Sequence, residues 1–182
     1  MRVYGDNAGN MWIATRKHIY ALSFDEEGTL QGVGEQSYQA TTPDVPFREI
    51  PGLGVLTAFD GAVHRYVLPT KLSGVTRLKE TPMPPTIKLP RGMIFLDIIQ
   101  YNRQLWFATN QGLYQSGSEL RAYRHNGSPE SLAHDFVSSL AIGVDGNLLV
   151  GTSAGVDILK DGKFEHWNTT TPTNPLSSNF VN

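Results

Sequence analysis

Short alternating runs of apolar and polar residues, separated by turn-forming dipeptides, recur along this chain of 182 residues. Period-two alternation is typical of β-strands, and the 3.6-residue period of a helix is absent. In the clearest stretch the pattern predicts four consecutive strands, at residues 137–144, 148–152, 156–159 and 164–167. Asp145-Gly146 and Asp161-Gly162 separate two pairs of these strands, and Asp-Gly favours a type I′ turn because both central positions need positive φ. This stretch therefore predicts an antiparallel four-stranded sheet.

A short string that ends in Thr or an equivalent residue occurs four times. The copies are residues 6–15, 54–63, 101–109 and 145–152. Counted from Thr15, Ala58, Thr109 and Thr152, they lie 43, 51 and 43 residues apart. Two further pairs of segments keep a step of 44 residues, namely 120–123 with 164–167 and 131–138 with 175–182. Independent landmarks that share one period indicate a structural repeat.

Units of about 40 to 50 residues with four antiparallel strands each are typical of β-propeller blades. We therefore predict an all-β fold, a β-propeller segment of about four blades, each a four-stranded antiparallel sheet. The predicted blades cover residues 3–40, 41–85, 86–124 and 125–167, and residues 168–182 begin the next repeat. Trp12 and Trp106 share one position of the repeat, which favours packing between neighbouring sheets over a carbohydrate-stacking platform.

Three strings resemble the two-component regulator propeller repeat. They are Gly-Asn-Met-Trp-Ile-Ala-Thr at 9–15, Leu-Trp-Phe-Ala-Thr-Asn-Gln-Gly-Leu-Tyr at 105–114, and Ser-Leu-Ala-His-Asp-Phe-Val-Ser-Ser-Leu at 131–140, which leads into Asp-Gly-Asn at 145–147. The second unit departs from the pattern, because it lacks the Trp and carries a proline-rich stretch at 81–90. The resemblance implies a periplasmic, extracytoplasmic sensor region of a bacterial inner-membrane signalling protein, such as a histidine kinase, a hybrid two-component kinase or a diguanylate cyclase.

The two ends of the chain correspond to parts of one strand. Val181 and Asn182 match the start of an inner strand whose end matches residues 3–6. The resemblance implies rings of seven or eight blades, more than the four repeats here. We therefore expect a fragment of a larger propeller. Its expected partners are the rest of the parent propeller, or a second copy that pairs through open blade edges into a homodimer.

Composition excludes several other classes of protein. The chain has 15 Lys and Arg against 17 Asp and Glu, a net charge of −2, so we expect no nucleic acid partner. The absence of cysteine excludes a disulfide scaffold, a thiolate zinc site and a cysteine nucleophile. The sequence has neither the long apolar run of a transmembrane helix nor the start of a signal peptide, so the extracytoplasmic location follows from the resemblance alone.

No catalytic, metal or cofactor site is predicted. His125, His134 and His166 lack the spacing of metal ligands, and we interpret them as polar loop residues. Residues 6–10 and 25–27 are interpreted as turns, and neither a Gly-x-Ser-x-Gly elbow nor a phosphate-binding glycine loop occurs. We therefore expect no enzyme activity in this chain, whereas the resemblance implies a kinase or cyclase domain elsewhere in the parent protein.

Binding is the remaining possibility. Ligands of propellers usually sit on loops that join the outer strand of one blade to the inner strand of the next, here residues 124–136 and 168–180. Neutral hydrogen-bonding groups beside aromatic residues suit a sugar or another uncharged polar ligand, although ordinary loop composition explains them too. The candidate ligand-binding residues are Tyr123, His125, Asn126, His134, Asp135, Trp167, Asn174 and Asn179.

Three functional hypotheses follow. The leading one is a non-catalytic sensor propeller segment that binds a small molecule, an oligosaccharide or a peptide. A propeller lyase or hydrolase is the first alternative, and it requires convergent His, Glu or metal-ligand residues. A protein-interaction scaffold is the second alternative, and the sequence does not separate it from a sensor.

Overall fold

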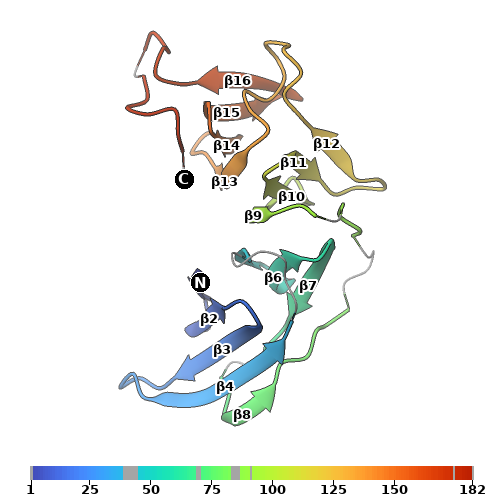
Figure 1. Ribbon diagram of the computed structural model, residues 1–182. Coiled ribbons are helices and arrows are strands. Elements are labelled where there is room, and N and C mark those ends of the chain that lie inside the picture. The colour runs from blue at the N-terminus through green and yellow to red at the C-terminus, as the bar shows by residue number, and fades with distance from the viewer. Residues whose placement is uncertain are drawn as a thin grey trace. The chain divides into compact units, whose positions relative to one another are not determined.

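The computed structural model describes residues 2–38, 45–68, 71–82, 87–90, 92–173 and 175–181. All regular structure among these residues is strand, as the sequence pattern predicts (Figure 1). In the described part of the chain no helix is long and apolar enough to cross a membrane. The chain divides into two compact units, residues 1–92 and 93–182, which are described separately.

The first unit begins with one sheet that follows the chain order. Its strands are β1 (Arg2–Gly5), β2 (Asn10–Ala14), β3 (His18–Phe24) and β4 (Leu30–Ser37), each antiparallel to the next. A fifth strand, β8 (Gly74–Arg77), joins the outer edge of β4 in parallel orientation. The sequence pattern did not predict this strand. Its residues belong to the second predicted blade, residues 41–85, but they pair with a strand of the first.

Two glycines of β4 let this insertion approach closely. A Cβ atom on Gly32 would lie 2.4 Å from the backbone of Leu72, and a Cβ atom on Gly34 would lie 2.5 Å from the Leu78 side chain. Leu72 and Leu78 are both buried, one on each side of β8 in the sequence. The Leu72 N–H also donates to the buried Ser23 hydroxyl at 2.9 Å, so the insertion is fixed to the sheet by packing and by hydrogen bonding.

The second sheet of the first unit has three strands, β5 (Phe47–Ile50), β6 (Gly54–Phe59) and β7 (Ala62–Tyr66). Its outer edge carries two isolated antiparallel bridges, Ala62 with Lys88 and Tyr66 with Glu80. Four prolines lie at 82, 84, 85 and 90, and proline lacks the N–H that a continuous ladder requires. The predicted four-stranded form is therefore wrong for this sheet, and two bridges stand in place of its outer strand.

The second unit contains two regular blades. The third sheet consists of β9 (Phe95–Tyr101), β10 (Gln104–Thr109), β11 (Gly112–Gln115) and β12 (Arg121–Tyr123). The fourth consists of β13 (Val137–Ile142), β14 (Leu148–Thr152), β15 (Gly155–Lys160) and β16 (Lys163–Trp167). Both are antiparallel and follow the chain order, so the four-stranded prediction is confirmed here. Taken with the first unit, the chain is a β-propeller segment built from four consecutive sheets.

The repeated tryptophans are buried in equivalent places, as predicted. Trp12 on β2 is fully buried, and its ring contacts Phe47 and Tyr66 of the neighbouring sheet at centroid distances of 6.0 and 5.6 Å. Trp106 on β10 is also buried and belongs to a core cluster that includes Leu140 of β13. Each tryptophan therefore packs between two sheets, and neither offers a free face for a sugar.

The recurring threonine closes a turn between the second and third strands. The Oγ1 atoms of Thr15, Thr109 and Thr152 donate to the carbonyl oxygen three residues on, at 3.1, 2.7 and 2.9 Å. Each also accepts the amide N–H two residues on. In the second sheet Phe59, which pairs across its turn as Thr109 does, takes this position. The sequence alignment had put Ala58 there, one residue away.

The type I′ prediction holds at one Asp-Gly turn and fails at the other. Positive φ at both central residues occurs at 60–61, 102–103 and 161–162. At Asp145-Gly146 only the glycine has positive φ, 80°. The Gly143 N–H donates to the Asn147 carbonyl at 2.9 Å, which closes a wider turn. Hydrogen bonds from Asn147 to the Asp145 carboxylate stabilise this wider form.

Candidate functional site

The polar side chains of the 124–136 loop mainly hold the loop itself. The His125 N–H donates to Asp135 Oδ1 at 2.7 Å, and His125 Nδ1 lies 2.7 Å from the Leu132 carbonyl oxygen. His134 Nδ1 accepts the Phe136 N–H at 2.9 Å. Three of the predicted ligand-binding residues therefore already have partners inside their own loop.

Two of the remaining predicted residues, both asparagines, also make hydrogen bonds within their own loops. Asn126 Oδ1 accepts the N–H two residues on at 2.9 Å, and Asn179 Oδ1 accepts the Thr169 N–H at 2.8 Å. Trp167 is half-buried at the end of β16, and Asn174 lies outside the described residues. Asn126 thus acts as a turn-forming residue, an established use of this side chain, whereas Asn179 links two parts of its own loop.

Tyr123, another of the predicted binding residues, contacts aromatic, cationic and amide side chains. Its ring stacks on Trp106 at 5.4 Å and meets Phe164 edge-on at 5.6 Å. The Arg121 guanidinium lies 4.7 Å from the ring centroid, and the hydroxyl donates to Gln115 Oε1 at 2.6 Å. Burial raises the pKa of the Tyr123 hydroxyl above its ordinary value, and the charge of Arg121 opposes this shift. The hydroxyl therefore stays protonated and acts as a hydrogen-bond donor.

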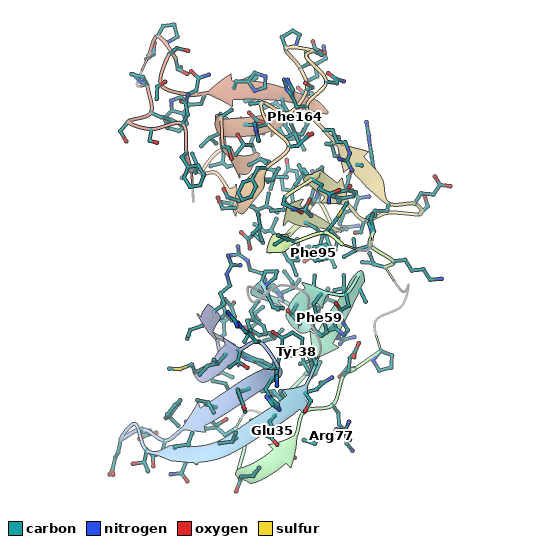
Figure 2. All side chains as sticks on the ribbon, in the orientation of Figure 1. Glu35, Tyr38, Phe59, Arg77, Phe95 and Phe164 are labelled. Atoms are coloured by element: carbon teal, nitrogen blue, oxygen red, sulfur yellow. The ribbon has the colours of Figure 1, made fainter. Side chains whose placement is uncertain are left out.

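A cleft of about 310 Å³ brings two of the predicted residues together. Its lining includes Arg121, Tyr123, Arg124, Asn126, Glu130 and Phe164. The cleft lies between β12, the loop that follows it and β16 of the next sheet, where Figure 2 labels Phe164. An ion pair between Lys163 and Glu130, 2.7 Å long, stands at its rim. His134, Trp167 and Asn179 do not line it.

Asp157 is the residue that the sequence reasoning missed. It is fully buried on β15, and its carboxylate accepts the Ala133 N–H at 2.8 Å and lies 2.8 Å from His166 Nδ1. Burial raises the pKa of this carboxyl, while the hydrogen bonds from Ala133 and His166 oppose the rise. The sequence did carry a signal for this residue, because Asp157 is a carboxylate between the apolar residues Val156 and Ile158 of a predicted strand. Asp157 attaches the 124–136 loop to the fourth sheet.

The described residues hold no group of three or more His, Asp or Glu side chains that could bind a metal ion. His166 is bound to Asp157, whereas His134 faces its own loop. The three histidines considered in the sequence therefore do not converge on one point.

Comparisons with known proteins extend this description. No family model matches the chain, and no curated protein matches it. Among solved structures, the extracellular domain of BT4673, a proposed one-component system of B. thetaiotaomicron, superposes with a TM-score of 0.61 at 16% identity. The extracellular domain of BT3049, a proposed hybrid two-component system of the same organism, gives 0.61 at 21% identity. A streptogramin B lyase gives 0.56 at 16% identity.

These similarities differ in extent. The alignments cover 97%, 91% and 94% of this chain, but only 22% of each signalling domain and 54% of the lyase. The chain thus spans about a fifth of the length of the signalling domains that it matches. At these identities the comparisons show a shared fold, which agrees with the propeller segment described above.

Proposed function

We propose that this chain is a non-catalytic, ligand-binding segment of an extracytoplasmic sensor propeller in a bacterial two-component-type signalling protein. The observation that carries the proposal is the match of more than nine tenths of the chain to extracellular domains of two such systems. The repeat strings at 9–15, 105–114 and 131–140 support it independently. On this proposal the chain lies on the periplasmic side of the inner membrane.

The ligand is proposed to be an uncharged polar molecule, either a carbohydrate or a peptide. The cleft beside β12 combines amide and hydroxyl groups with the ring of Tyr123. Its charged residues are Arg121, Arg124 and Glu130, and each has a partner within the protein. Arg121 lies over the Tyr123 ring, Arg124 donates to the Tyr114 hydroxyl, and Glu130 is paired with Lys163. Such a lining favours hydrogen bonding to a neutral ligand over attraction of a strongly charged one.

A propeller lyase is the second candidate, because a streptogramin B lyase shares the fold. Among the described residues, Asp157 and His166 form an acid–base pair that joins a buried carboxylate to a partly exposed imidazole. Both oxygens of Asp157 are engaged, one with His166 and the other with the Ala133 N–H. This arrangement suits a structural role for the pair better than proton transfer to a substrate.

A thermal-shift screen of the whole chain against neutral oligosaccharides and short peptides tests the proposal. A ligand present at 100 times its Kd stabilises the folded state by about 2.7 kcal/mol, which raises the Tm of a chain of this size by about 5 to 10 °C. Recovered ligand is then analysed by mass spectrometry. We expect stabilisation with the ligand recovered intact. Chemical conversion of the ligand would establish the lyase or hydrolase alternative, and no stabilisation by any member of the panel would contradict a binding role.

A further inference from the structure

A second and larger pocket lies at the opposite end of β12 from the predicted loop. It has a volume of about 440 Å³ and is lined by side chains of β10, β11 and the 116–120 loop, with Arg121 at the start of β12. The residues used below are Gln104, Gln115, Gly117, Ser118, Glu119 and Arg121. None of them was among the residues that the sequence suggested for binding.

The two glutamines of this pocket are oriented by a chain of hydrogen bonds. The Tyr123 hydroxyl donates to Gln115 Oε1 at 2.6 Å, and Gln115 Nε2 donates in turn to Gln104 Oε1. Within the part of the chain that the structure describes, Gln104 Nε2 makes no hydrogen bond, so both of its N–H groups are available to a ligand. Tyr123 therefore fixes which face of each amide the pocket presents.

The rest of the wall supplies complementary groups. Ser118 contributes a hydroxyl, Glu119 a carboxylate and Arg121 a guanidinium. Gly117 lies next to the free amide, because a Cβ atom there would lie 3.4 Å from Gln104 Nε2. The pocket thus offers both donors and acceptors, and its two charged groups are opposite in sign.

Arg121 connects this pocket with the cleft that holds Tyr123 and Asn126. It lines both of them, and β12 between them is only three residues long. The two hollows therefore share one side chain, that of Arg121 at the start of β12. A ligand that filled both would run along the outer strand of the third sheet.

We propose that this double hollow binds a neutral oligosaccharide along β12. One sugar unit occupies the Gln104–Gln115 pocket, and a second lies beside Tyr123. Sugar hydroxyls donate and accept at once, which matches amide, hydroxyl and carboxylate groups placed side by side. A peptide strand would be held by main-chain hydrogen bonds and by pockets for its alternate side chains, whereas the lining of the Gln104–Gln115 pocket is mainly polar and contributes one apolar side chain, Leu120. The inference rests on the proposed ligand-binding function and assigns it a site and a ligand class.

Calorimetric titration of the whole chain tests the assignment. The probes are matched di- and tetrasaccharides of glucose, xylose, mannose, galactose and N-acetylglucosamine. We expect at least one tetrasaccharide to bind more tightly than its disaccharide. Gln104→Ala removes the free amide and should weaken that binding at least tenfold. Gln111→Ala is the matched control, because Gln111 is exposed in the turn at the other end of β10.

The Arg121→Ala variant tests whether one ligand occupies both hollows. Because Arg121 lines both, its loss should weaken the tetrasaccharide more than the disaccharide. Urea unfolding of each variant verifies that the fold is retained. Tetrasaccharide binding that is unaffected by both Gln104→Ala and Arg121→Ala would place the sugar elsewhere and overturn this inference, while the proposed function would stand. The short peptides of the thermal-shift screen are titrated alongside the sugars. Binding of peptides but of no oligosaccharide would refute the ligand class, and failure of every ligand would refute the proposed function itself.

Discussion

Replacing Asp157 should loosen the attachment of the 124–136 loop to the fourth sheet. The buried carboxylate is the acceptor for the Ala133 N–H and the partner of His166 Nδ1, each at 2.8 Å. Asp157→Ala leaves both groups without this partner at part-buried positions. An unsatisfied donor costs about 1 to 3 kcal/mol when it is fully buried, and because these two are only part-buried the variant should lose about 2 to 3 kcal/mol of unfolding free energy in total.

The Asn variant should behave differently. Asparagine keeps an oxygen for the Ala133 N–H, and its Nδ2 can donate to His166 Nδ1 in the tautomer that leaves this nitrogen an acceptor. It also avoids the burial of a charge, the cause that raises the pKa of Asp157. We therefore expect Asp157→Asn to stay within about 1 kcal/mol of the wild type at pH 7.

The raised pKa of Asp157 also determines how the stability of the protein changes with pH. The folded protein holds the Asp157 proton more tightly than the unfolded chain does, because burial raises the pKa. The contribution of Asp157 to stability is therefore greatest below the ordinary Asp pKa of about 3.9 and falls as the pH rises through the raised value. Relative to Asp157→Asn, the wild type should lose stability across this interval.

Urea unfolding followed by tryptophan fluorescence measures these differences, and amide hydrogen exchange at Ala133 reports on the loop directly. Asp161→Asn is the control, because it removes a carboxylate from an exposed turn of the same sheet. The reasoning is refuted if Asp157→Ala matches the wild type within about 0.5 kcal/mol, a margin usual for surface changes. It is equally refuted if the Asn variant is as unstable as the Ala variant.

Two further changes test the repeat. Gly155→Ala should lower the unfolding free energy by about 2 kcal/mol or more, because Gly155 has a φ of +124° and a Cβ there would lie 2.4 Å from the Trp167 carbonyl oxygen. Gly5→Ala is the control, because a Cβ there meets nothing within 4 Å. Equal urea midpoints for the two variants would contradict this reasoning. Thr152→Val and Thr109→Val should each cost about 1 to 2 kcal/mol in the same assay, because each removes a buried hydroxyl that closes a turn. Costs that differ widely between the two threonines would show that the blades are not equivalent.

Local patterns predicted the regular part of the fold. The run at 148–152 is a strand with those bounds, and the period placed Trp12 and Trp106 in equivalent buried positions. These features depend on alternation and turn chemistry, which residues close in the sequence determine. The turn at 161–162 was predictable for the same reason.

Features that depend on distant partners were not predictable. Strand β8 pairs with β4 because Gly32 and Gly34 admit Leu72 and Leu78, and that fit joins segments about 40 residues apart. In the core of the same unit Tyr38 packs against Phe59 from another sheet, at 4.8 Å (Figure 2). Local turn chemistry also misled the prediction once, where the Asn147 side chain favours a wider turn than Asp-Gly alone indicates.

The candidate site was predicted only in part. Tyr123 and Asn126 line the cleft beside β12, whereas His125, His134 and Asp135 are occupied within their loop. Polar residues that face a cleft and polar residues that hold their own loop look alike in a sequence, because the folded loop determines their partners. The Gln104–Gln115 pocket was missed because its residues come from three separate strands and a connecting loop that only the sheet brings together.

The proposed role is tested most directly by NMR titration of the isotopically labelled chain with the neutral tetrasaccharide that binds best. One experiment then reports the location of binding from the protein resonances and any turnover from the ligand resonances. We expect saturable shifts centred on Gln104, Gln115 and Arg121, with the ligand signals unchanged over time. New ligand signals from a product would contradict the non-catalytic role, and shifts confined to residues away from β12 would contradict the site.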